Sequence, residues 1–154
     1  MPIITIVFVA IPESMLLGAV ALAIMGIRPR LNPLLTVGVL QALTVYLIRM
    51  LALPMALHAV VLMLFLGGYL ANRFRAPLKR TISGAFIAWL FLVTSEVLFI
   101  PIFFQLFSVT GAEVMASPWL RILASLPQQI TLLAVFVIAY RIRGFHQADD
   151  AQSF

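Results

Sequence analysis

The pattern of apolar and polar residues divides the chain into five long apolar runs separated by short polar breaks. The runs are continuous rather than alternating, and most reach the roughly 20 apolar residues that a transmembrane helix needs. They cover residues 3–27, 31–51, 55–70, 82–107 and 119–140. The pattern therefore predicts an all-α polytopic membrane protein, a bundle of five transmembrane helices. The bundle forms a single domain over residues 1–143, followed by a short polar cytoplasmic tail over 144–154.

The breaks between the runs predict how the helices connect. Leu51 to Pro54 is too short for a loop, so the second and third helices are expected to form an antiparallel hairpin. Ser108 to Pro118 is the longest connection, and its Thr110-Gly111 and Ser117-Pro118 pairs are turn signals.

The composition makes lipid the solvent of this protein. The chain is 64% hydrophobic and 10% charged, whereas a soluble domain is roughly 45–50% apolar and about 25% charged. This excludes a soluble enzyme, a nucleic-acid-binding domain and a disordered tail. The chain has no cysteine and only 2 histidines, which excludes a disulfide framework and a thiolate metal site and argues against a multi-histidine centre. We expect no metal and no cofactor.

The basic residues predict the orientation of the helices. Lysine and arginine concentrate on the cytoplasmic side of membrane proteins. One side of the predicted bundle carries Arg28, Arg30, Arg73, Arg75, Lys79, Arg80, Arg141 and Arg143, and the other carries Arg49 and Arg121. We therefore expect an outside N-terminus, a cytoplasmic C-terminus and multi-pass insertion in the plasma membrane, the inner membrane of a bacterium. No basic residue precedes the first run, so it is not expected to be a cleaved signal peptide.

Polar side chains inside the runs are functional candidates, because an ionisable group costs roughly 2.5–3.5 kcal/mol to insert at a helix centre. The candidate ligand-binding residues are Glu13, Gln41, Glu96 and Gln128 near the midplane, and Arg49, His58 and Arg121 near the outer surface. This one-sided distribution predicts an outward-facing polar cavity that could hold a zwitterion, a peptide or a polar head group.

An alternative for the same residues is purely structural. Glu13 and Glu96 would then form buried ion pairs with the two arginines, and the glutamines would hydrogen-bond between helices, worth about 0.6 kcal/mol each. Pro12 is expected to loosen the turn around Glu13, because proline removes a helix hydrogen bond. Trp89 lies deeper than the interfacial aromatic residues and is expected to pack in the bundle.

The residues that membrane catalysis needs are not in the apolar runs. The aspartates, Asp149 and Asp150, are in the tail, no HExxH sequence occurs, and the cysteine of a Cys–His pair is missing. We therefore expect that the protein is not an enzyme.

Several short motifs carry a family resemblance, namely Ile11-Pro12-Glu13-Ser14, Gly26-Ile27-Arg28-Pro29, Ser117-Pro118-Trp119-Leu120-Arg121 and Leu126-Pro127-Gln128. Together they resemble the multi-pass membrane input segments of sensor histidine kinases from spore-forming Firmicutes. The resemblance implies a membrane segment that detects an extracellular signal and passes it to a cytoplasmic kinase. The chain stops at Phe154 with no kinase domain, so it is expected to be a stand-alone input module.

Three functional hypotheses follow. The first is a sensory or ligand-binding module that acts through a cytoplasmic signalling partner. The alternative is a substrate-binding or accessory subunit of a small-molecule transporter, with an ATPase partner docked on the helix face of Ala19 and Ala23. The third is a structural scaffold. Besides the lipid bilayer, a homodimer is compatible with each hypothesis, and nucleic acid with none.

Overall fold

The computed structural model describes residues 3–50 and 55–143, and apart from short connections these residues are helical. The elements in chain order are α1 (Ile3–Thr5), the π-helical η1 (Ile6–Ala10), α2 (Ile11–Met25), α3 (Leu31–Met50), α4 (Met55–Phe74), α5 (Leu78–Phe107), α6 (Gly111–Ala116) and α7 (Pro118–Arg143). Five helices in the described part of the chain are long and apolar enough to cross a membrane, with α1, η1 and α2 acting as one. The predicted five-helix membrane bundle is confirmed. The connection predicted at Leu51 to Pro54 lies outside the described residues.

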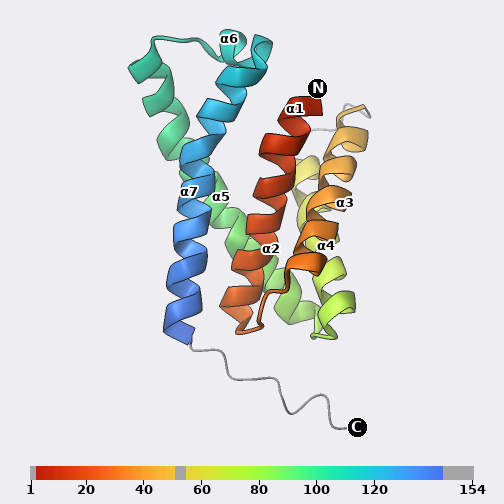
Figure 1. Cartoon of the computed structure of the whole chain (residues 1–154). Helices are drawn as coiled ribbons and strands as arrows, with labels where there is room; N and C mark the ends of the chain where they lie inside the picture. Colours follow the sequence, from red (N-terminus) through yellow and green to blue (C-terminus); the bar gives the residue numbers. More distant parts are fainter. Residues whose placement is uncertain (1–2, 51–54, 144–154) are drawn as a thin grey trace, which may run out of the picture.

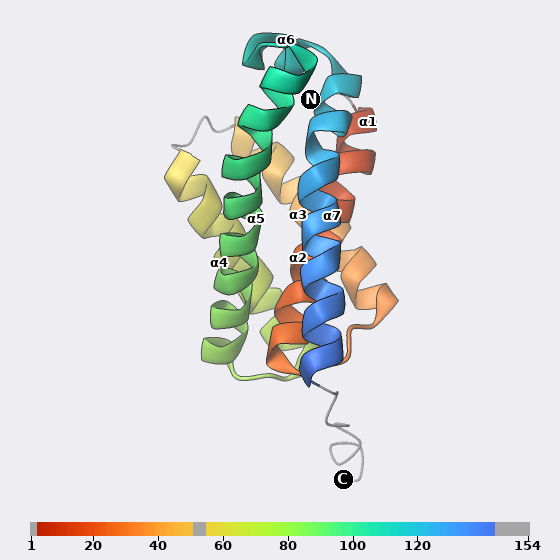
Figure 2. The same cartoon turned by 90° about the vertical axis from the view of Figure 1, so that its left-hand side faces the viewer.

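The helices run up and down beside one another, with α2 in the middle (Figures 1 and 2). The start of α1 and the short helix α6 lie at one end of the bundle, and the last turn of α7 lies at the other (Figure 1). The α2–α3 and α4–α5 connections share the end of α7, so the arginines at 28, 30 and 75 gather there. The side of the membrane that this end faces stays a prediction.

Small residues allow the backbones of neighbouring helices to approach α2 closely. A Cβ atom on Gly38 of α3 would lie 3.1 Å from the carbonyl oxygen of Ile11, and one on Gly84 of α5 would lie 3.1 Å from that of Ala21. Small residues at helix interfaces in membranes permit this contact. The face of Ala19 and Ala23, the predicted ATPase docking face, is buried in the same core, at 5% and 0% exposed. That expectation is wrong, because the chain's own helices cover the face.

The ends of the helices are closed by backbone and side-chain hydrogen bonds. Gly26 adopts a left-handed conformation, with φ of 74°, and the next amide, that of Ile27, donates to the carbonyl of Leu22 at 2.9 Å, which is the Schellman arrangement. The guanidinium of Arg80 then donates to the carbonyl of Met25 at 2.5 Å. A cation at a helix C-terminus also offsets the helix dipole. Arg80, expected only to set the orientation, therefore ties α5 to the end of α2.

Adjacent glycines of α4 provide a matched test of helix contact. A Cβ on Gly67 would lie 3.1 Å from Cα of Ile82 in α5, whereas one on Gly68 would meet nothing within 4 Å. Alanine gains about 1 kcal/mol over glycine inside a helix. We expect Gly68→Ala to raise the thermal midpoint of the protein in nanodiscs, and Gly67→Ala to lower it, since overpacking costs typically about 1–3 kcal/mol. Equal shifts for both variants would show that α4 and α5 do not make this contact.

Candidate functional site

The junction of η1 and α2 is an irregular stretch of backbone at membrane depth. Pro12 has no N–H to offer the carbonyl of Phe8 four residues earlier, and a π-helical segment, Ile6–Ala10, stands directly before it. The irregular backbone thus lies in the turn before Pro12, whereas Glu13, around which the loosening was expected, lies in the regular α2. The side-chain amide of Gln129, on α7, donates to the freed Phe8 carbonyl at 3.2 Å. An irregular backbone in a membrane needs such a partner, because no water is there to replace the missing bond.

The residue before Gln129 binds the same region of the first helix. The Nε2 atom of Gln128 donates to Oε2 of Glu13 at 3.0 Å, and Gln128 is 6% exposed. Two consecutive glutamines of α7 therefore hold one backbone carbonyl and one carboxylate of the first helix. This contact fixes the position of the Glu13 carboxylate and pairs two of the predicted site residues.

Glu96 and Gln41 lie at the same level of the bundle as this junction. Glu96 is twelve residues beyond Gly84, which contacts Ala21 and Met25 of the antiparallel α2. At about 1.5 Å per residue, Glu96 therefore lies level with residues 9–13. Gln41 is three residues beyond Gly38, which contacts Ile11 and Met15, and so it also lies level with the junction.

Two of these polar groups lack partners among the described residues. Glu96 is half-buried, and neither a hydrogen-bond donor nor a cation among the described residues contacts its carboxylate. Gln41 is 1% exposed, and its Oε1 atom accepts no hydrogen bond. Both groups accept hydrogen bonds. A cation or a hydrogen-bond donor would therefore complement them at this level of the bundle.

Arg121 is engaged elsewhere. Its Nε atom donates to the carbonyl of Val114 at 3.3 Å, and a terminal nitrogen donates to the carbonyl of Met115. These are the last carbonyls of α6, which lies between α5 and α7 at one end of the bundle (Figure 2). Arg121 therefore anchors α6 on α7.

The other two residues predicted at the outer surface have different outcomes. The side chain of Arg49 lies outside the described residues. His58 is half-buried on α4. Gly67 contacts Ile82 in the antiparallel α5, so His58, nine residues before Gly67, lies level with Phe91. It is thus about 7 Å deeper than Glu96, because the start of α4 lies further from the end that carries α6 than the C-terminal ends of α3 and α5 do.

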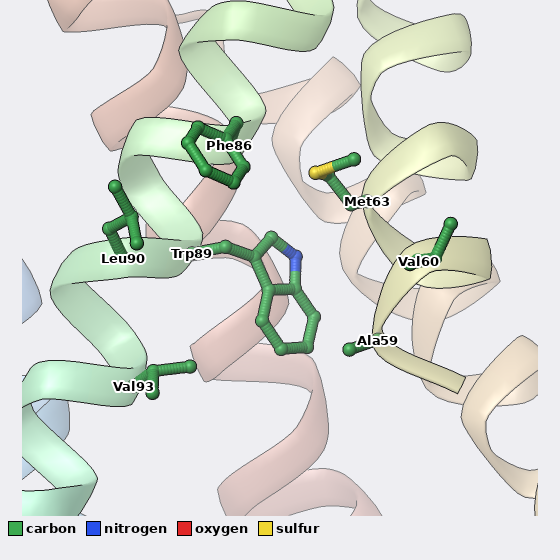
Figure 3. A pocket seen from close by; sticks show the side chains of 7 residues that line it. All are labelled: Ala59, Val60, Met63, Phe86, Trp89, Leu90 and Val93. Atoms are coloured by element: carbon green, nitrogen blue, oxygen red, sulfur yellow. The ribbon is translucent and has the colours of Figure 1, made fainter. Parts of the chain in front are cut away.

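A hollow of about 240 Å³ opens between α4 and α5 (Figure 3). Its lining residues are Ala59, Val60, Met63, Phe86, Trp89, Leu90 and Val93. None of the predicted polar residues belongs to this lining. The indole of Trp89 projects from α5 toward α4 (Figure 3), and its Nε1 atom is buried without a hydrogen-bond acceptor. Trp89 was expected to pack, and its unmatched donor is not visible from the sequence.

The helix α6 was also not expected, although the sequence carries a signal for it. The hydroxyl of Thr110 accepts from the backbone N–H of Glu113 at 3.3 Å, and the Glu113 carboxylate accepts from the backbone N–H of Thr110 at 2.7 Å. This is a capping box, and the pattern of threonine followed three residues later by glutamate is its sequence signature.

No family model, no curated protein and no solved structure matches the chain. The resemblance to the membrane segments of sensor kinases therefore stays a prediction.

The link between Pro12 and Gln129 can be tested by a double-mutant cycle. In the natural sequence, Gln129→Leu removes the donor to the Phe8 carbonyl and should cost on the order of 1 kcal/mol of stability. In Pro12→Ala the new N–H at position 12 can bind that carbonyl, so Gln129→Leu should then cost clearly less. The measurement is the free energy of unfolding in mixed micelles. A coupling of zero would mean that Gln129 does not compensate for Pro12.

The capping box predicts a pH dependence of α6. Hydrogen bonds from the backbone and hydroxyl of Thr110 hold the pKa of the Glu113 carboxyl below its usual range. Because the pKa is lowered in the folded state, its contribution is complete above the ordinary glutamate pKa and is lost as the pH falls through the lowered value. Hydrogen exchange of the α6 amides, corrected for intrinsic rates, should accelerate over that interval. In Glu113→Gln the acceleration should be absent, and its persistence would assign it to another group.

Proposed function

We propose that this protein is a membrane-embedded binding module for a cationic ligand. In this proposal the carboxylate of Glu96 receives the ligand, and the Glu13–Gln128 pair beside the same junction transmits binding to α2 and α7. The observation that carries the proposal is Glu96 itself, a half-buried carboxylate that no described donor or cation contacts. An ionisable side chain held inside a membrane span without a partner is costly, and such groups generally mark a ligand or ion site.

The proposed ligand chemistry is narrower than the one expected from the sequence. A zwitterion or peptide would need one of the two arginines, and the guanidinium of Arg121 is occupied by the carbonyls of α6. The two candidate groups that lack a described partner, the Glu96 carboxylate and Oε1 of Gln41, are acceptors. A positively charged ligand then complements them better than a zwitterion does.

In the proposed orientation the N-terminus and α6 are outside and the C-terminal end of α7 faces the cytoplasm of a bacterial cell. The basic residues between α2 and α3 and between α4 and α5 support this by the positive-inside bias. Because α7 carries Gln128 and continues to the cytoplasmic end, it is the natural output element. The resemblance to kinase input segments suggests a signalling protein as the partner.

Cation binding is tested by thermal unfolding in neutral phosphatidylcholine nanodiscs. The probe is dodecyltrimethylammonium, and dodecanol is its uncharged counterpart. We expect the cation to raise the unfolding midpoint of the natural protein and of Glu113→Gln, which removes a carboxylate outside the spans. In Glu96→Gln this saturable shift should disappear, while the effect of dodecanol should be the same in all three. Equal shifts in Glu96→Gln and the natural protein would contradict the proposal.

The partner is tested separately, by purifying the C-terminally tagged protein in mild detergent and identifying bound proteins by mass spectrometry. A histidine kinase or response regulator supports the sensory proposal. A pair of ATPase subunits would instead make the protein a transporter subunit, which was the sequence-based alternative. If the preparation contains neither a signalling protein nor ATPase subunits, the scaffold hypothesis replaces that of a relayed signal.

A further inference from the structure

The hollow between α4 and α5 is open toward the surroundings of the bundle. Its rim residues Val60, Phe86, Leu90 and Val93 are each exposed over 44–50% of their surface. In a membrane-spanning bundle this surface contacts lipid tails, so a ligand reaches the hollow from within the bilayer. The lining is apolar. The indole N–H of Trp89 has no acceptor among the described residues and is covered by neighbouring side chains, so a ligand oxygen reaches it only when those side chains move aside.

The lipid bilayer does not readily supply that acceptor. Trp89 is eleven residues from the start of α5, or about 16 Å, and the hydrocarbon core is about 30 Å thick. The indole therefore lies near the middle of the membrane, away from the oxygens of the head groups. The acceptor must come from a molecule that carries an oxygen into the bilayer interior.

Glu96 stands on the same face of α5 as Trp89. Seven residues rotate a helix by about 700°, which is about 20° short of two turns, and advance it by about 10 Å. Val93, on the rim of the hollow, is one turn from Glu96. The carboxylate thus lies just beyond the end of the hollow nearer to α6, about 10 Å along the axis from the unmatched N–H.

We infer that the α4–α5 hollow and Glu96 form one binding site for a lipophilic amine that enters from the bilayer. Its apolar body fills the hollow, its ammonium group pairs with Glu96, and an oxygen about 10 Å from the nitrogen accepts from the Trp89 indole. This inference rests on the proposed function and names its ligand class. Charge complementarity selects the occupant, because a lipid acyl chain would fill the hollow and leave both Glu96 and the indole unmatched.

The test uses three probes in neutral nanodiscs. The first is dodecyltrimethylammonium with a ketone at its eighth carbon, the second is dodecyltrimethylammonium without the ketone, and the third is the uncharged ketone of the same chain. In the Trp119→Phe chain, Trp89 is the remaining tryptophan of 2, so its emission reports the hollow directly. The affinity of each probe is taken from the saturable change in that emission or from thermal unfolding.

We expect the keto-ammonium probe to bind at least tenfold more tightly than the plain ammonium. Trp89→Phe keeps the ring and removes the N–H, so it should abolish this advantage, measured by thermal unfolding. Glu96→Gln should weaken both cations at least tenfold and leave the uncharged ketone unchanged. Ala59→Phe, which fills the hollow, should abolish the emission change of Trp89.

The outcomes separate the inference from the proposed function. If both cations bind in a Glu96-dependent way, but the ketone gives no advantage and Trp89 emission does not change, the inference is wrong and the cation site at Glu96 stands. If neither cation binds in a Glu96-dependent way, the proposed function fails together with the inference. If the ketone advantage persists in Trp89→Phe, the acceptor is bound elsewhere and the inference is wrong.

Discussion

A polar group inside this bundle is costly unless it finds a partner in the protein or in a bound molecule, because hydrocarbon offers none. This constraint explains the contacts that hold the bundle together. The carbonyl of Phe8, freed by Pro12, is taken by Gln129, and the carboxylate of Glu13 is taken by Gln128. At the two ends, Arg80 binds the last carbonyl of α2 and Arg121 binds the last carbonyls of α6. The contacts of Gln128, Gln129 and Arg80 join helices that are distant in the sequence, and those of Arg121 join the neighbouring α6 and α7.

The central position of α2 makes these contacts possible. Its buried residues pack against α3, α5 and α7 with close backbone approach at Gly38 and Gly84. Such close packing sets the heights of the helices relative to one another. Consequently Glu96 and Gln41 come to the level of the Pro12 junction, and Glu96 remains there without a described partner.

The sequence predicts the five spans well, because continuous apolar runs have few alternative structures in a membrane. It also predicts the irregular turn at Pro12, since the missing N–H is a local property. The partners of the polar groups were not predictable in the same way. Gln129 binds a backbone carbonyl 121 residues away, and counting residues from span ends gives depth but not the rotation of each helix. The capping-box pattern of Thr110 and Glu113 predicts the start of a helix, but the turn residues around it favoured the prediction of a loop.

The positions of the helices relative to one another also change the roles assigned to individual residues. From its depth in the sequence-based bundle, Arg121 was predicted to belong to a binding site. In the structure its contacts show that it anchors the short helix α6. Trp89 was predicted to pack in the bundle. In the structure it carries a buried N–H donor with no acceptor among the described residues. A membrane site is therefore better located by the polar groups that the fold leaves unmatched than by polarity alone.

In the proposed function, Glu96 is the carboxylate left open for a cation, while Glu13 is already held by Gln128. Infrared difference spectroscopy of the glutamate-labelled protein, with and without dodecyltrimethylammonium, tests this directly. We expect a change in one carboxyl band that persists in Glu13→Gln and vanishes in Glu96→Gln. A change that vanishes in Glu13→Gln and persists in Glu96→Gln, or no carboxyl change on cation addition, would contradict it.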